Sequence, residues 1–184
     1  EKLIEDFMIA ANETIAERFT HLDLPFVYRV HDIPDNEKIT KFLNLIKILG
    51  YQVTSRKNDF SNQGLQKLLA ELSDKKEFDI LSALLLRSMK KAVYQTNNIG
   101  HFGLASKMYC HFTSPIRRYP DLIVHRLTRL FLFENEINME TINVINSDLD
   151  EIALQCSERE QAAEKAERDV EDMKMAEYME SHIG

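Results

Sequence analysis

Segment 111–126, HFTSPIRRYPDLIVHR, contains the residues of this chain whose types and spacing best suit chemistry. Ser114 can cap a helix, and Pro115 suits the first helical position, where its missing N–H costs nothing. Free backbone N–H groups at such a start attract anions, and the helix dipole strengthens the attraction. Arg117 and Arg118 would lie in the first turn, and a guanidinium fork matches two phosphate oxygens at once. The segment therefore predicts a helix start that binds phosphate; the alternative is a capped core helix with solvated arginines.

Other residues of this segment have weaker functional interpretations. Arg118 is expected to position the backbone or to pair with an acid, and Asp121 to cap the helix or to pair with an arginine. Tyr119 could stack on a base, because aromatic rings hold single strands, or it could be a half-buried residue of the helix start. His111 and His125 have no adjacent third ligand, so we expect them to be structural.

The complete string resembles the signature near the end of the catalytic domain in the ribonuclease II / ribonuclease R family of 3′-to-5′ exoribonucleases, and is most similar to the ribonuclease R branch. Further strings that resemble the family follow its order and cover essentially the whole chain. They are LIEDFMIAAN at 3–12, PFVYRVH at 25–31, HFGL at 101–104 and AERDV at 166–170.

The resemblance implies processive hydrolysis of single-stranded RNA to nucleoside 5′-monophosphates at a site built around Mg²⁺. In the family, an Asp-x-x-x-x-x-Asp-x-Asp-Asp pattern supplies the metal ligands. This pattern is absent from the sequence, and its nearest pair, Asp148 and Asp150, is expected in a turn before a long helix. Residues 1–184 are therefore predicted to form the C-terminal portion of an RNB catalytic domain. The upstream half and the cold-shock and S1-type RNA-binding domains are missing, and the chain alone should be inactive.

Three positions match functional residues of the family. Arg117 matches the catalytic arginine, which contacts the scissile phosphate and stabilises charge in the transition state. Glu5 matches an acidic residue that contacts the terminal ribose, whose 2′-hydroxyl separates RNA from DNA. Glu167 matches a glutamate near the end of the RNA channel. The alternatives are a solvated arginine, an exposed helix carboxylate and an ion pair with Arg168 or a neighbour. From their residue types, Ser114, Arg118 and Tyr119 are also expected among the RNA contacts, and no metal ligand is expected in the chain.

Composition is that of an ordinary globular domain, with 44% hydrophobic and 29% charged residues in 184. No apolar run approaches the length of a membrane span, and the start lacks a signal-peptide pattern. Cys110 and Cys156 fit no metal spacing, so reduced, buried thiols are expected. We therefore expect a cytoplasmic protein without membrane contact.

The net charge of −7 is unevenly distributed along the chain. Residues 101–130 carry five basic residues and one acidic, whereas residues 131–184 carry four basic and 15 acidic. A channel for single-stranded RNA needs local positive charge rather than a basic protein overall. The distribution is therefore compatible with RNA binding by the central segment, and the acidic segment is interpreted as a solvated helical face.

Hydrophobic periodicity predicts an α+β fold that is predominantly helical with a few short strands. Apolar faces at helical spacing precede Gly50, a good residue to follow a helix end, and recur in a proline-free, glycine-free stretch after Ser147. The expected helices are 2–19, from Pro34-Asp35 to Gly50, from a Ser61 cap to Leu72, 77–91, from Ser114 to about Phe133, and Ser147 to about Ser181. The expected strands are 26–30 and 51–54, with broken extended segments over 93–112 and a loop at 135–139.

Two functions from different classes remain. The first is half of an exoribonuclease active site, with single-stranded RNA and the missing half of the domain as partners. The second is a non-catalytic helical module that binds RNA or a protein. In the first case, apolar helix faces that should pack on the missing half predict self-association of the chain.

Overall fold

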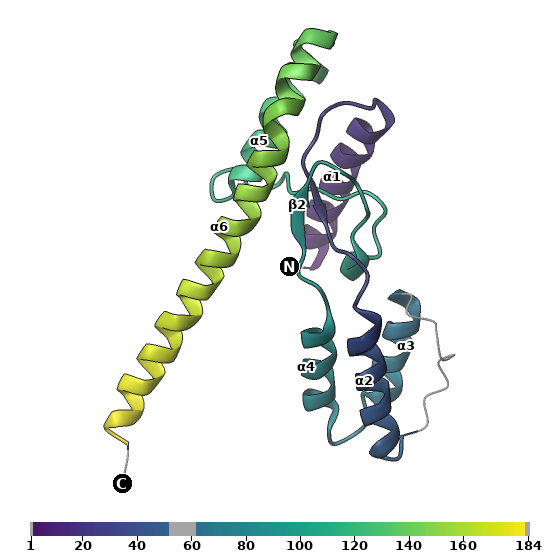
Figure 1. Ribbon diagram of the computed structural model, residues 1–184, viewed down its shortest axis with the longest axis vertical. Coiled ribbons are helices and arrows are strands. Elements are labelled where there is room, and N and C mark those ends of the chain that lie inside the picture. Colours follow the sequence, from purple (N-terminus) through teal and green to yellow (C-terminus); the bar gives the residue numbers. More distant parts are fainter. Residues whose placement is uncertain (1, 52–61, 183–184) are drawn as a thin grey trace. The chain divides into compact units, whose positions relative to one another are not determined.

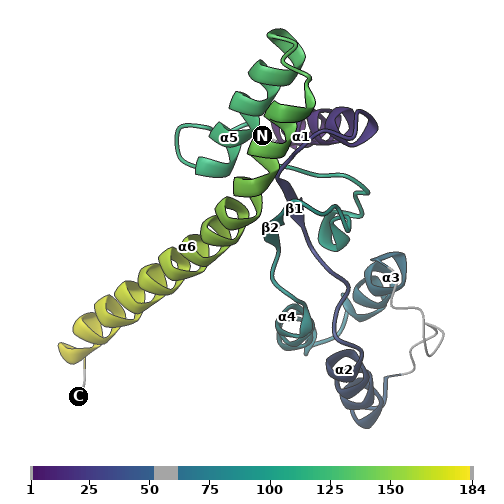
Figure 2. The same ribbon diagram turned by 45° about the horizontal axis from the view of Figure 1, so that its top comes forward.

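A computed structural model describes residues 2–51 and 62–182. The chain divides into two units. Unit 1 comprises Glu1–Tyr28, Val93–Asn97 and Cys110–Gly184, and unit 2 comprises Arg29–Ala92 and Asn98–Tyr109. The described part is mainly helical, and the strands β1 (Tyr28–Val30) and β2 (Val93–Gln95) pair as a two-stranded sheet, which confirms the predicted fold class (Figure 2). No helix in the described ranges is long and apolar enough to cross a membrane.

Aromatic side chains pack around Phe19 in the core of unit 1. The helix α1 spans Lys2–His21 and buries Phe19, whose ring stacks on Phe26 with centroids 4.4 Å apart. Phe131 meets Phe19 edge to face at 6.4 Å. Phe131 belongs to a π-helical turn, η2 (Arg129–Phe133), which continues the helix α5 (Tyr119–Thr128).

The longest element of unit 1 is the helix α6, Met139–Glu180. Asn138 caps it, because its side chain accepts a hydrogen bond from the Thr141 N–H. Its first half lies beside α5 in both views and buries Leu149, Ala153 and Ser157 (Figures 1 and 2). Residues 161–182 are exposed, as expected for the acidic face.

The described part of unit 2 contains three α-helices: α2 (Asn36–Ile48), α3 (Asn62–Leu72) and α4 (Phe78–Ser88). The Asp35 carboxylate caps α2 by accepting from the Glu37 N–H at 2.9 Å. Gly50 follows the end of α2 with a φ of +83°, a conformation that side chains with a Cβ rarely adopt. The apolar stripes predicted from the sequence meet in one core of Ile39, Phe42, Ile46, Leu65, Leu68, Leu72, Leu81 and Leu85.

The structure corrects several predicted boundaries. The helix α6 begins at Met139 rather than Ser147, so Asp148 and Asp150 lie within a helix and not in a turn. The helix α4 ends at Ser88, short of residue 91, and β1 begins at Tyr28 rather than at residue 26. The predicted Ser61 cap and most of the predicted strand 51–54 lie outside the described residues.

Candidate active site

The segment that contains the two adjacent arginines is a turn, not the start of a helix. The carbonyl of Ser114 accepts hydrogen bonds from the backbone N–H groups of Arg117 at 3.3 Å and Arg118 at 3.2 Å. The helix α5 begins only at Tyr119, with Pro120 in its first turn. The prediction that Ser114 begins the helix is therefore wrong. A helix from Ser114 would place Pro120 in its interior, where the ring clashes with the preceding turn and a hydrogen bond is lost.

A buried carboxylate joins this turn to α5. Asp121 is completely buried, and its Oδ2 accepts from the Ser114 N–H at 2.7 Å and from Arg118 Nη2 at 2.8 Å. Its position in the first turn of α5 also suits a negative charge, because the helix dipole is positive there. The predictions that Arg118 pairs with an acid and that Asp121 pairs with an arginine are confirmed.

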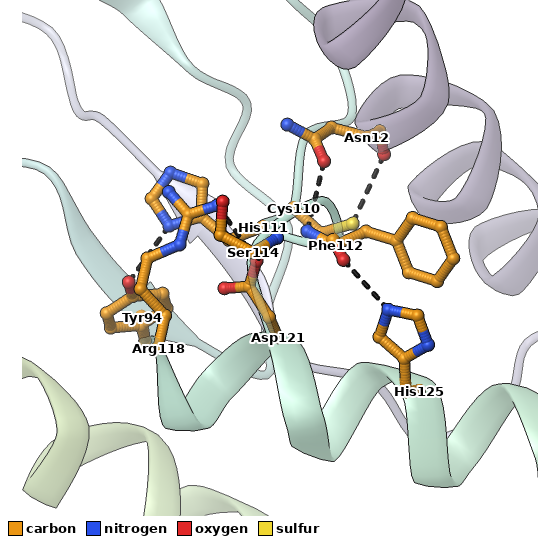
Figure 3. A network of polar contacts seen from close by, with 9 residues as sticks. All are labelled: Asn12, Tyr94, Cys110, His111, Phe112, Ser114, Arg118, Asp121 and His125. Atoms are coloured by element: carbon orange, nitrogen blue, oxygen red, sulfur yellow. Dashed lines mark hydrogen bonds and ion pairs between the residues drawn. The ribbon is translucent and has the colours of Figure 1, made fainter. Parts of the chain in front are cut away.

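The residues before the turn are held by α1 and α5, as Figure 3 shows. Asn12, buried on α1, accepts the Phe112 N–H at its Oδ1 at 3.0 Å, and its carbonyl accepts from the Cys110 thiol. Burial raises the pKa of Cys110, which keeps the thiol protonated as a donor. His125 on α5 bonds the Phe112 carbonyl through Nε2 at 2.9 Å and stacks on the Phe112 ring. His125 therefore has a structural contact, as predicted.

His111 likewise has a structural partner on β2. Its Nδ1 lies 2.9 Å from the Tyr94 hydroxyl, and the two rings meet edge to face. The backbone N–H of Tyr94 donates to the Ser157 hydroxyl on α6 at 2.8 Å. Segments far apart in the sequence thus converge around the turn.

A cleft of about 690 Å³ opens in unit 1 between the start of α5 and the middle of α6. Four predicted site residues line it: Arg117, Arg118, Tyr119 and Glu167. The remaining lining residues are Tyr94, Pro120, Gln155, Cys156, Arg159, Glu160, Ala163 and Glu164.

Charge in this cleft is mixed, and its arginines differ. The guanidinium of Arg118 is only 21% exposed and is neutralised by Asp121. Arg117 is exposed, and its side chain forms no ion pair with another residue of the ranges 2–51 and 62–182. Tyr119 is 52% exposed, which leaves its ring open to a planar ligand. The cleft can therefore present the exposed guanidinium of Arg117 and the ring face of Tyr119 to the same ligand.

Two predicted site residues lie elsewhere. Glu5 is exposed in the first turn of α1 and is not among the residues that line this cleft. Ser114 is half-buried, and its backbone N–H is already bonded to Asp121. The structure thus brings together four of the six predicted residues, and it gives Ser114 a role in holding the turn.

Sequence reasoning missed Arg159 and Tyr94 as lining residues. Arg159, Ala163 and Glu167 are four residues apart on α6, so they share one helix face, and this spacing could have identified Arg159 from the predicted Glu167. Tyr94 had no such signal, because it reaches the cleft from a distant part of the sequence. Cys156 also lines the cleft; burial and the nearby Glu160 raise the pKa of its thiol, so it remains protonated at neutral pH.

The described residues do not fit a metal centre. Within residues 2–51 and 62–182, no group of three histidine, cysteine, aspartate or glutamate side chains could hold a metal ion. Asp150 accepts a hydrogen bond from the Thr96 hydroxyl on the segment that follows β2. The cleft thus offers groups that can bind an anion and a base, without ligands for a metal.

Comparison with known proteins gives consistent matches over the chain. A family model, RNB domain, matches residues 1–134. Ribonuclease R of Thermotoga maritima is 50% identical over 100% of this chain and 26% of its own length. Ribonuclease R 1 of Lactococcus lactis is 44% identical over 100% of this chain and 22% of its own length. The chain thus spans about a quarter of the length of these curated relatives.

Solved structures share the fold. Mycoplasma genitalium RNase R in complex with ribose methylated single-stranded RNA is 31% identical, with a TM-score of 0.89 over 98% of this chain and 28% of that one. Yeast Ssd1, a pseudonuclease, is 25% identical, with a TM-score of 0.63 over 84% of this chain and 20% of that one. Because the family match covers well over half of its residues, and the likeness to RNase R extends over almost all of them, this chain belongs to the RNB-domain family.

Proposed function

We propose that this chain is part of a processive 3′-to-5′ exoribonuclease of the cytoplasm that hydrolyses single-stranded RNA to nucleoside 5′-monophosphates with Mg²⁺. The observation that carries the proposal is the exposed Arg117 guanidinium at a cleft, on a turn fixed at both ends by Asp121. The family and the relatives named Ribonuclease R support the reaction class, and the RNA complex of the Mycoplasma genitalium protein supports the substrate.

Arg117 is the proposed catalytic residue. A guanidinium fork can contact two oxygens of the scissile phosphate, and its charge opposes the negative charge that grows in the transition state. Arg118 is less suited to this task, because Asp121 already neutralises it. Arg118 would instead approach the RNA backbone as a neutralised pair.

Each of the other proposed RNA contacts binds a different part of the substrate. Tyr119 stacks on a base, because every base offers a π-face to an aromatic ring. Glu5 accepts a hydrogen bond from the terminal 2′-hydroxyl, and Glu167 contacts the strand near the end of its channel. Ser114 contributes through the turn that it begins.

Magnesium belongs to this proposal, with its ligands outside this chain. The described residues do not fit a metal site, so no catalytic step is derived through the metal. We propose that an upstream half of the catalytic domain supplies the ligands and that the present chain is inactive alone.

A second candidate is a non-catalytic helical module that binds RNA or a protein. The likeness to yeast Ssd1 favours it, because this fold then also occurs in a pseudonuclease. The two candidates differ in whether the whole protein cleaves RNA at all.

Single-turnover cleavage of labelled single-stranded RNA by the whole protein tests the proposal. Arg117→Ala should slow cleavage about 100- to 1000-fold, as loss of one such electrostatic contact does. RNA affinity should change little, because the contact acts on charge that develops in the transition state. The matched control is Arg129→Ala, which removes an exposed arginine that pairs with the surface residue Glu134. If the wild-type whole protein does not cleave RNA, the binding module is favoured. If Arg117→Ala loses affinity and rate equally, Arg117 is a docking contact.

A further inference from the structure

We propose that Asp121 is a positioning residue that fixes Arg117 for the reaction, an inference that rests on the proposed function. Asp121 cannot be a catalytic residue itself, because it is completely buried and touches no part of the cleft surface. Its effect on the reaction must pass through the turn from Ser114 to Arg118.

The position of Arg117 depends on backbone contacts. Its side chain is exposed and has no recorded partner among the described residues, so nothing at the guanidinium end holds it before substrate binds. Its backbone N–H donates to the Ser114 carbonyl at 3.3 Å. The direction in which Arg117 leaves the turn is therefore set by the placement of Ser114 and of the residue that follows.

Asp121 fixes both ends of this turn with one oxygen atom. Oδ2 accepts from the Ser114 N–H at 2.7 Å and from Arg118 Nη2 at 2.8 Å, and Arg117 lies between these two anchored residues. Asp121 is itself held in the first turn of α5, a helix whose residues Ile123, Val124 and Leu127 are buried. The carboxylate thus transmits the rigidity of a packed helix to the turn.

The charge of Asp121 has a second consequence at the same place. Because it neutralises Arg118, the two adjacent arginines do not repel each other as two free cations would. Arg117 can therefore keep a side-chain direction toward the cleft, which both residues line. An uncharged residue at position 121 would lose this effect even if it kept the Ser114 hydrogen bond.

Asp121→Asn in the whole protein separates these contacts. The amide oxygen can still accept from the Ser114 N–H, but the charge that pairs with Arg118 is gone. We expect kcat to fall about 10- to 100-fold, as small misplacements of a catalytic group do, with KM for RNA unchanged. Asp32→Asn is the matched control: it removes the carboxylate of the Asp32–Lys90 pair in unit 2 and should leave kcat unchanged.

A double-mutant cycle with Arg117→Ala distinguishes positioning from general loss of structure. If Asp121 acts through Arg117, then Arg117→Ala/Asp121→Asn should match the kcat of Arg117→Ala within about twofold, because the positioned group is already absent. A further 10- to 100-fold loss in the double variant would overturn the inference and leave the proposed function intact. If Asp121→Asn does not fold, Arg118→Lys, which keeps the charge but loses the fork, takes its place in the cycle.

Amide hydrogen exchange of residues 114–118 completes the test. Asp121→Asn should speed exchange in this turn relative to wild type, whereas Asp32→Asn should not. If Arg117→Ala itself leaves kcat unchanged, the proposed catalytic role of Arg117 fails, and the exchange result then decides whether Asp121 holds the turn. Unchanged exchange in the Asp121→Asn variant would overturn the inference by itself.

Discussion

Arg117 and Arg118 are neighbours in the sequence, yet their side chains have different surroundings. The difference is caused by one carboxylate. Asp121 lies three residues after Arg118 and pairs with it, whereas Arg117 stays exposed. The sequence allowed the pairing of Asp121 with an arginine to be predicted, because the candidates are few and close. It also indicated Arg118 as a partner for an acid, but it did not indicate that the Ser114 N–H binds the same carboxylate, because the helix prediction had excluded that turn.

We predict that Arg117→Lys restores little of the activity lost in Arg117→Ala. The ammonium keeps the charge, but it cannot place two donors on two phosphate oxygens. Single-turnover rates of the two variants of the whole protein should agree within about tenfold, well short of wild type. A lysine variant close to the wild-type rate would show that only the charge at position 117 matters.

Two helix starts were predicted wrongly. At α5 two candidate start sequences competed, and at α6 the first residues have low helix propensity and were assigned to no helix. Ser114-Pro115 and Pro120 both fit a helix start, and the later proline decides, because a proline in the helix interior is costly. The stretch from Thr141 to Asn146 contains β-branched residues and asparagines of low helix propensity, yet it is helical, because Asn138 caps α6 ahead of it. Strongly periodic stripes, as in α2 and α3, were predicted correctly.

The short helix η1 (Phe102–Leu104) depends on two histidines of unit 2. The Nδ1 of His31 accepts from the Gly103 N–H at 3.0 Å, and the Nδ1 of His101 accepts from the Leu104 N–H at 3.2 Å. Both rings must therefore keep Nδ1 unprotonated. The HFGL string, noted in the sequence without a role, thus builds a local structure.

We predict that Gly103→Ala destabilises unit 2 through its contact with His31. A Cβ at this position would lie 2.8 Å from His31 Nδ1, closer than real contacts allow. The expected loss in the free energy of unfolding is about 1–3 kcal/mol, measured by urea denaturation. The same substitution in a His31→Ala background should cost clearly less, because the clash is removed. An equal loss in both backgrounds would contradict the assigned cause.

We also predict that the free energy of unfolding decreases as pH falls, because His101 becomes protonated. Burial, together with the neighbouring His31 and Arg29, lowers the pKa of His101 to about 4 from its usual 6.5. Between these pH values the unfolded state binds more protons than the folded state, so the contribution is complete above pH 6.5 and is lost as pH falls toward 4.

His101→Asn provides the comparison for this acid effect. The asparagine Oδ1 can accept from the Leu104 N–H in place of Nδ1, but it does not titrate. Urea denaturation from pH 7.5 to 4.5 should therefore show a weaker pH dependence in this variant than in wild type. If the free energy of unfolding depends on pH equally in both proteins, His101 is not the group that causes the acid effect.

For the whole molecule, an apolar strip on α1 has no cover among the described residues. Leu3, Ile4, Phe7 and Met8 are between 45% and 69% exposed, and the pairs spaced by four residues share one face of the helix. Contiguous apolar surface of this kind is uncommon on monomers. We propose that the strip packs on the upstream half of the catalytic domain that the proposed function requires.

We predict that the isolated chain self-associates through this strip. Light scattering over a concentration series should show a rising mean mass, and Phe7→Ser should reduce it. Phe133→Ser, which removes a still more exposed ring in η2 that is not part of the strip, should have a smaller effect. A chain that stays monomeric at high concentration would show that the strip needs no partner.

We propose that this chain contributes the arginine of an active site whose metal ligands lie outside it. The most direct test incubates labelled single-stranded RNA and Mg²⁺ with the purified chain, its Arg117→Ala variant and the whole protein. We predict mononucleotide release by the whole protein and none by the chain, because its described residues form no metal site. Release by the chain that survives stringent purification and is lost in Arg117→Ala would show instead that the chain holds a complete active site.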